Sequence, residues 1–332
     1  MVDKQNDPYF ECSEKQIRQY LDSSATFLHA AQAQKAAAEV RGSMAWREVN
    51  GAEYLIRSNA SGGQHSLGRR SLGTEAMHAK FVDRKESAQT TLKARTQALN
   101  EARKLNRVFG VGRTPNIVVG ILQQLQRAGI ADQFITVGTH ALYAYESMCG
   151  VRVSSGALAT QDIDLLFDTR KRMAFLSTMK RLDTSLIGVL QRADKTFRVM
   201  PDKLQTAVNN DAFEVDLIRR NAVQEDPHPL RMSDHEDDFW AVQISSGERL
   251  VSGRRFEQMV VANNGEMAMM RTVHPLDFVA VKHALSMSPS REAAKRPRDA
   301  LQARIVEDLW TEYMKPAEDA SERINQRDRP TL

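Results

Sequence analysis

Hydrophobic and polar positions repeat with different periods along the chain and divide it into three stretches. In the first forty residues and again over 74–107, apolar residues recur at helical spacing and form thin stripes on polar helices. Between these helices, two short apolar runs flank Asn50-Gly51, and both residues of that dipeptide tolerate positive φ, so we expect a β-hairpin within residues 44–58. From Thr114 onward, short aliphatic runs alternate with helical patterns, which predicts a mixed α+β domain.

Within the third stretch, strands and helices are expected to follow one another closely. The predicted strands are 134–137, 162–167, 197–200, 206–208 and 213–218, and the predicted helices are 116–129, 139–148 and 171–181. A second Asn-Gly pair at 264–265 predicts another hairpin, and the prolines at 275 and 297 fit the first turns of two further helices.

Two local features lie in the first stretch. Thr74 is the predicted N-cap of the helix that continues to about Arg107. Just before it, residues 61–73 (SGGQHSLGRRSLG) are Gly-rich and basic but lack the Gly-Lys-Ser/Thr ending of a P-loop. We interpret this segment as a connector rather than a phosphate-binding loop.

These patterns predict four regions in the 332 residues. They are an N-terminal helical and β-hairpin extension (1–110), a central α+β domain (111–273), a C-terminal helical subdomain (274–315) and a disordered tail (316–332). Hydrophobic residues make up 42% and charged residues 27% of the chain, which is typical of folded globular proteins and excludes fibrous or wholly disordered classes.

Composition sets limits on location and partners. No apolar run approaches the ~20 residues of a membrane helix, and the first residues lack the apolar segment of a signal peptide, so we expect a cytoplasmic protein. Two cysteines, Cys12 and Cys149, are too few for a disulfide framework or a thiolate zinc site. The formal net charge of +4 permits a polyanionic partner without requiring one.

The strongest candidate chemistry lies in residues 160–168, TQDIDLLFD. In a strand, Asp162 and Asp164 share one face while the aliphatic residues between and after them point into the core. Two adjacent carboxylates repel each other unless a cation neutralises them, and Mg²⁺ or Mn²⁺ prefers carboxylate oxygens. A solvated strand edge without metal is the alternative interpretation. Asp168, after the strand, is expected to cap the next helix.

A third carboxylate is predicted in the run FEVDLI. Asp216 lies between aliphatic residues there, and Glu214 falls on the same strand face as a second choice. If this strand is the neighbour of 162–167, three aspartates converge on a two-metal site of the kind that supports phosphoryl transfer.

A phosphate-binding turn is predicted at Gly138-Thr139, between a strand and a helix. The glycine allows close backbone approach, and the Thr hydroxyl and the amides of the helix start can hold a phosphate. His140 is expected to face solvent or the rim of the substrate site. Lys282, inside the apolar run LDFVAVKHAL, either keeps its ammonium in solvent along an apolar surface or points toward a triphosphate.

In this order along the chain, the pieces resemble the DNA polymerase β-like nucleotidyltransferase superfamily. Its mark is a Gly-Ser/Thr at a helix start, then an hDhDh strand, then a third hDh strand. The runs GTHALYAYE, ATQDIDLLFD and NNDAFEVDLI are similar to the bacterial NTP-transferase 8 family within it, best over about 130–220. This chain departs from the superfamily pattern in having Thr139 instead of the commoner serine. It also has a long gap before Asp162, which we expect to form a loop near the site.

The resemblance implies the roles of the site residues. The fold would be α+β, a polymerase β-like mixed sheet with flanking helices. Gly138, Thr139 and Lys282 would bind the triphosphate, and metals would be carried by the aspartates, namely Asp162, Asp164 and Asp216.

The same resemblance implies a metal-dependent nucleotidyltransferase that moves an NMP from an NTP to an unidentified acceptor and releases pyrophosphate. Mg²⁺ or Mn²⁺ would be the cofactor. A tRNA or a protein would be compatible as acceptor, and the basic cluster KRPR at 295–298 favours nucleic acid. The alternative is a non-catalytic or toxin/antitoxin-type regulatory protein that retains the fold, although the intact carboxylates argue against an inactive enzyme.

Overall fold

The computed structural model describes residues 8–59, 62–224 and 226–319, and the chain separates into two units. Unit 1 comprises residues 1–14 and 112–332, and unit 2 comprises residues 15–111. Residues 320–332 of the tail predicted to be disordered lie outside the described residues, and 316–319 are helical. Among the helices of the described ranges, none is both long and apolar enough to cross a bilayer.

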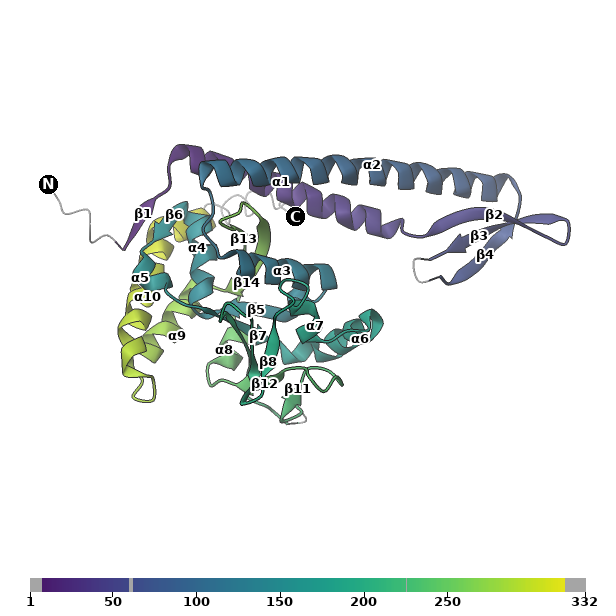
Figure 1. Ribbon diagram of the computed structural model, residues 1–332. Helices are drawn as coiled ribbons and strands as arrows, with labels where there is room; N and C mark the ends of the chain where they lie inside the picture. The colour runs from purple at the N-terminus through teal and green to yellow at the C-terminus, as the bar shows by residue number, and fades with distance from the viewer. Residues whose placement is uncertain (1–7, 60–61, 225, 320–332) are drawn as a thin grey trace, which may run out of the picture. The chain divides into compact units, whose positions relative to one another are not determined.

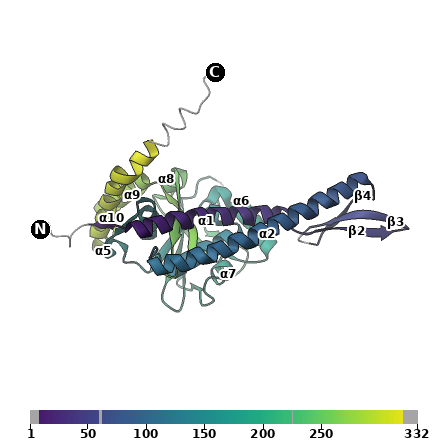
Figure 2. The same cartoon turned by 90° about the horizontal axis from the view of Figure 1, so that it is seen from above.

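Unit 2 consists of an antiparallel pair of helices and a small sheet whose strands lie between the two helices in the sequence. Helices α1 (Glu14–Glu39) and α2 (Leu72–Phe109) run side by side in both views (Figures 1 and 2). A buried polar group joins them, because the Ser23 hydroxyl donates to Asn106 Oδ1 at 2.7 Å and Gln19 Nε2 donates to Ser23 Oγ at 2.9 Å. Burial of these polar side chains is tolerated because they form hydrogen bonds with one another.

The N-terminus of α2 corrects one sequence prediction. Ser71, not Thr74, is the N-cap, and its hydroxyl accepts from the Thr74 amide. The Thr74 hydroxyl in turn accepts from the Ser71 amide at 2.8 Å, which makes Thr74 the reciprocal partner of a capping box. Both residues carry hydroxyls, so the sequence located the cap only to within one turn.

The sheet of unit 2 has three antiparallel strands, β2 (Ser43–Val49), β3 (Ala52–Ser58) and β4 (Gln64–Arg69). The predicted hairpin is confirmed, with φ of 52° at Asn50 and 72° at Gly51. The interpretation of residues 61–73 as a connector is wrong, because β4 lies within them. Four of the six residues of β4 are exposed and Gly68 has no side chain, so its sequence lacks the apolar alternation that predicts a strand.

Unit 1 is built on a mixed sheet with the order β11-β12-β10-β7-β5-β14-β13. Outside this order, β9 pairs with β10, and β8 pairs with β9. Its strands are β5 (Phe134–Val137), β7 (Asp162–Phe167), β8 (Arg198–Met200), β9 (Lys203–Val208), β10 (Glu214–Arg219), β11 (Leu230–Arg231), β12 (Trp240–Gln243), β13 (Arg255–Val261) and β14 (Met267–Val273). The predicted hairpin at Asn264-Gly265 is confirmed as the connection between β13 and β14.

Helices flank this sheet, and α9 and α10 lie side by side (Figures 1 and 2). The helices are α3 (Asn116–Ala128), α4 (Leu142–Cys149), α5 (Ser155–Leu158), α6 (Arg172–Leu182), α7 (Leu186–Leu190), α8 (Gly247–Ser252), α9 (Pro275–Met287) and α10 (Arg296–Leu309). Short turns are η1 (Ala131–Gln133), η2 (Gly138–Ala141), η3 (Thr169–Lys171), η4 (Ala293–Lys295) and the π-turn η5 (Trp310–Met314).

The core beneath the site is aliphatic and aromatic. Phe134, Phe167 and Phe175 pack with ring centroids 5.3–5.9 Å apart and are almost fully buried. Phe167 belongs to β7, so the apolar side of the strand that carries the paired aspartates is anchored in this cluster. Burial of such side chains contributes roughly 1.5–3 kcal/mol each and fixes which side of β7 is exposed.

The long segment before Asp162 is ordered, so the expected loop is wrong. It forms β6 (Val151–Val153) and α5, and β6 pairs antiparallel with β1 (Tyr9–Glu11) from the start of the chain. Neither three-residue strand is long enough to show a period in the sequence.

Candidate functional site

Strand register brings the predicted carboxylates together. β7 and β10 are parallel neighbours, with Asp164 directly opposite Asp216 and Asp162 opposite Glu214. On the other side, β5 runs antiparallel to β7 and places Val137, the residue before Gly138, opposite Asp164. The condition on which the three-aspartate site depends, that the two acidic strands are neighbours, is therefore met. The Gly-Thr turn follows directly after the residue that lies opposite Asp164.

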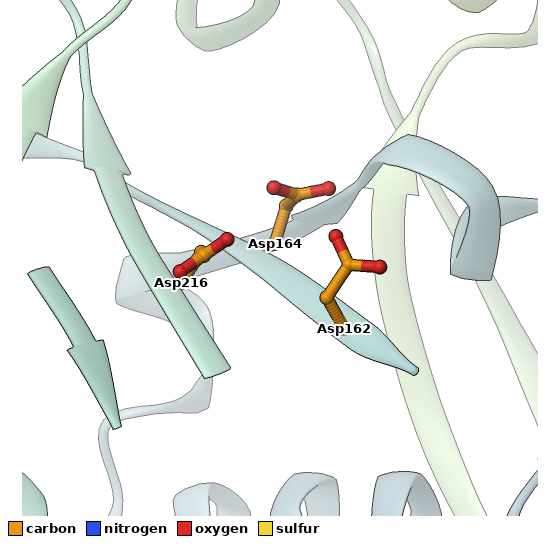
Figure 3. Close-up of side chains that lie close together, drawn as sticks. All are labelled: Asp162, Asp164 and Asp216. Atoms are coloured by element: carbon orange, nitrogen blue, oxygen red, sulfur yellow. The ribbon is translucent and has the colours of Figure 1, made fainter. Parts of the chain in front are cut away.

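Asp162, Asp164 and Asp216 form a compact cluster (Figure 3). Each can offer one carboxylate oxygen such that the three oxygens lie within 4.8 Å of one another. The hydroxyl of Thr160 donates to Asp162, and the hydroxyl of Thr206 donates to Asp216 at 2.5 Å. These hydrogen bonds orient two of the three carboxylates and leave their remaining oxygens available.

Burial and mutual repulsion of the carboxylates disfavour ionisation in the cluster. Burial, together with the charges of Asp162 and Asp216, raises the pKa of Asp164 to about 7. Burial also raises the pKa of Asp216, although the Thr206 hydroxyl opposes the shift. Three carboxylate oxygens within reach of one point fit a hard divalent cation such as Mg²⁺ or Mn²⁺.

Gly138 is required for the turn that faces these carboxylates. Its φ is +69°, in the left-handed region, and a Cβ at this position would overlap with the Asp164 carboxylate. The neighbouring Thr139 hydroxyl accepts from Gln302 Nε2 at 3.1 Å, and the same amide donates to the Ala157 carbonyl at 2.6 Å. Because a carbonyl partner requires the amide nitrogen, Gln302 is held as a donor, and the Thr139 hydrogen is left to donate elsewhere.

The site opens into a cavity of about 560 Å³, within the range of small-molecule sites. The described residues that line it combine the acidic cluster with basic side chains. Those basic side chains are Lys203, Lys282, Arg291, Lys295 and Arg298. Carboxylates on one side and cations on another form an arrangement that can hold a metal ion beside a polyphosphate.

Two of these basic side chains, Lys282 and Arg291, pair with the same buried carboxylate. Asp299 is fully buried, and its carboxylate accepts from Lys282 Nζ and Arg291 Nε, both at 2.8 Å. Burial opposes ionisation of Asp299, but these two partners lower its pKa below the ordinary value. Lys282 is itself buried and lines the cavity. Its ammonium is therefore held at the cavity wall rather than in open solvent.

Sequence reasoning missed two of the five basic side chains in the lining, Lys203 and Arg291, and connected KRPR with nucleic acid rather than with this cavity. Lys203 comes from β9, Lys295 from η4, Arg291 from the segment before η4, and Arg298 from α10. KRPR was singled out as a basic cluster, but Arg296 donates to two backbone carbonyls and Arg298 to the Ala159 carbonyl. No periodic pattern in the sequence connects these positions with the acidic strands.

Two further expectations have clear outcomes. Asp168 caps the turn that follows β7, since its side chain accepts from the Arg170 amide. His140 is buried beside Phe213 and Tyr143, so the expectation that it faces solvent or the rim is wrong. Burial lowers the pKa of His140 to about 4, and the ring is neutral at ordinary pH.

Comparison with known proteins agrees with this geometry. A profile of the NTP-transferase 8 family, described as nucleotidyltransferase, matches residues 116–325. Curated proteins and solved structures gave no significant match. The matched segment includes β5, β7, β10 and α9, the elements that carry the predicted site residues.

Proposed function

This chain belongs to the nucleotidyltransferase family, and we propose that it transfers an NMP from an NTP to a hydroxyl or phosphate acceptor. The observation that carries the proposal is the cluster of Asp162, Asp164 and Asp216 facing the Gly138-Thr139 turn across one cavity. In the proposed reaction the acceptor oxygen forms a bond to the α-phosphorus. The bond from that phosphorus to the bridging oxygen breaks, and pyrophosphate leaves with the bond electrons.

Asp162, Asp164 and Asp216 are the proposed metal ligands. Divalent metal bound there would stabilise the negative charge that develops on the attacking and leaving oxygens. Asp216 would also take the proton of the acceptor hydroxyl as general base.

The triphosphate would bind between the turn and the basic wall. Thr139 is free to donate its hydroxyl hydrogen to a phosphate oxygen, because Gln302 already donates to its oxygen. Lys282 and Arg291 are held by Asp299, so they need little reordering to contact the leaving pyrophosphate.

The first test is ligand-dependent stability. A ligand that binds only the folded state raises apparent stability in proportion to RT ln(1 + [L]/Kd). Thermal melting should therefore shift upward with at least one of the four NTPs in the presence of Mg²⁺ or Mn²⁺. The variants Asp162→Ala and Asp164→Ala should fold and lose this shift. The proposal fails if the wild type shows no shift at millimolar ligand and calorimetry shows no heat of binding.

The second test identifies the acceptor. Incubation with α-³²P-labelled NTPs, Mg²⁺ and cell lysate should label one class of macromolecule. We propose tRNA or protein as the acceptor, and sensitivity of the label to ribonuclease or to protease separates the two. The Asp216→Asn variant is the negative control, because it keeps side-chain size and removes the proposed base. Labelling that survives in this variant would contradict the assigned role.

A further inference from the structure

Unit 2 carries the basic excess of the whole chain. Residues 15–111 contain 16 lysines and arginines against 8 aspartates and glutamates, a net charge of +8, whereas the full chain has +4. The remaining residues are therefore net acidic. A basic unit attached to a net acidic one indicates a polyanionic partner for the extension itself.

The two faces of the unit 2 sheet differ. One face packs on α2, with Leu55 fully buried, Trp46 against His78 and the Arg57 guanidinium over the Phe81 ring at 4.3 Å. Side chains alternate along a strand, so the residues next to these in sequence point away from α2. That second face is here called the open face.

A cross-strand row of two arginines and a tyrosine crosses the open face. In the strand register, Arg47 of β2 is opposite Tyr54 of β3, and Tyr54 is opposite Arg69 of β4. Both arginines are exposed and the tyrosine is half-buried. Within the described strands the open face carries no carboxylate, because Glu48 and Glu53 pair opposite each other on the face toward α2.

The arginines on the two faces have different partners. Arg70 bonds to Glu53 and Glu75 at 2.6 and 2.7 Å, and Arg57 donates to backbone carbonyls, so both serve the packing of the sheet. Arg47 and Arg69, by contrast, form no ion pair with any described residue. Both side chains are exposed, so each guanidinium group can contact a phosphate of a bound polyanion.

From this row we infer that the open face binds single-stranded nucleic acid, with a base stacked on Tyr54 and phosphates contacted by Arg47 and Arg69. Stacking platforms flanked by basic side chains hold unpaired bases, because every base has a π-face and each arginine neutralises a backbone phosphate. This inference concerns binding by unit 2 and does not depend on the proposed transfer reaction.

The test is a salt series of binding by the full-length protein, without NTP and in EDTA, so that catalysis plays no part. Fluorescence anisotropy would follow labelled 20-nucleotide oligouridylate and oligothymidylate, and a duplex of equal length. Each phosphate contact on a single strand contributes about 0.7 to the slope of log K against log salt. We therefore expect Arg47→Ala/Arg69→Ala to reduce the slope magnitude by about 1.4.

The tyrosine has its own signature. Tyr54→Ala should weaken binding about tenfold with little change in salt slope, because stacking is not ionic. Tyr54→Phe keeps the ring and should bind within about twofold of the wild type. Single strands should bind more tightly than the duplex. Both single strands should bind, because stacking and phosphate contacts tolerate changes of base and sugar.

A charge-matched control separates this site from general attraction. Lys93→Ala/Arg95→Ala removes the same charge from exposed positions on α2. These positions lie two turns beyond Lys85, whose ammonium donates to the Gly42 carbonyl just before β2. This control should keep the wild-type slope, and all variants should keep the wild-type melting temperature. The inference is overturned if no oligonucleotide binds at 50 mM salt or if both double variants lose the same slope. It is also overturned if polyglutamate competes equally and Tyr54→Ala has no effect.

Discussion

Replacing Asp164 with asparagine should stabilise the metal-free protein above pH 7. Burial and the charges of Asp162 and Asp216 raise the pKa of this carboxyl from 3.8 to about 7 in the folded state. The unfolded chain ionises near the ordinary value, so between about pH 4 and 7 it releases the proton while the folded state keeps it. Folding stability therefore falls as pH rises through this window.

The magnitude follows from the width of the window. Each pKa unit corresponds to about 1.4 kcal/mol, so the wild type loses up to about 4 kcal/mol between pH 4 and pH 7 that the asparagine variant does not lose. For a unit of this size, 1 kcal/mol shifts the melting temperature by roughly 2–4 °C. We therefore expect Asp164→Asn to melt on the order of 10 °C above the wild type at pH 8. At pH 5 the gap should be less than half as large.

The assay is thermal melting of both proteins in EDTA at several pH values. Asp168→Asn is the matched control, because Asp168 follows the same strand and is also buried. Burial opposes its ionisation, but hydrogen bonds from Arg170 lower its pKa, so its carboxylate stabilises the fold. That variant should melt below the wild type at pH 8. Destabilisation by Asp164→Asn at pH 8, or a gap that does not change with pH, would refute the reasoning.

Further predictions concern the turn, the buried carboxylate of Asp299 and the buried histidine. Gly138→Ala should lower the melting temperature by a few degrees, since its φ of +69° costs a non-glycine residue roughly 1–2 kcal/mol, and calorimetry should show that NTP binding is lost. Asp299→Asn should destabilise the fold by about 3 kcal/mol in urea titrations, because Lys282 and Arg291 lose their shared counter-charge. Burial lowers the pKa of His140 to about 4, so the unfolded chain takes up a proton first as pH falls below 6.5. The melting temperature of His140→Gln relative to the wild type should therefore rise between pH 7 and pH 4.5, and a difference that does not change with pH would contradict this account.

The acidic half of the site was predictable because it depends on alternation within single strands. Asp162 and Asp164 are two residues apart between buried aliphatics, and Asp216 has the same setting in another strand. Whether the strands were neighbours depended on the sheet order, in which β7 lies between β5 and β10. The resemblance in the order of the motifs supplied that expectation, and the register bears it out.

The basic half was not predictable in the same way. Lys203, Arg291 and Lys295 reach the cavity from three segments that share no period and no motif. Gln302 is one polar residue in a helix pattern, and only the packing of α10 shows that it contacts Thr139. Long-range packing decides such contacts, and local sequence patterns do not record it.

The order of segments along the chain makes unit 2 an insertion rather than an appended arm. β1 precedes unit 2 in sequence yet pairs with β6 of unit 1, and the chain re-enters unit 1 at Gly112. A truncation that starts after Val111 would remove β1 and expose the edge of β6. The two ends of the insertion are close, since Gln16 Nε2 donates to the Gly110 carbonyl at 3.0 Å. An excised version should therefore keep residues 1–14 and join them to Gly112 through a short glycine linker.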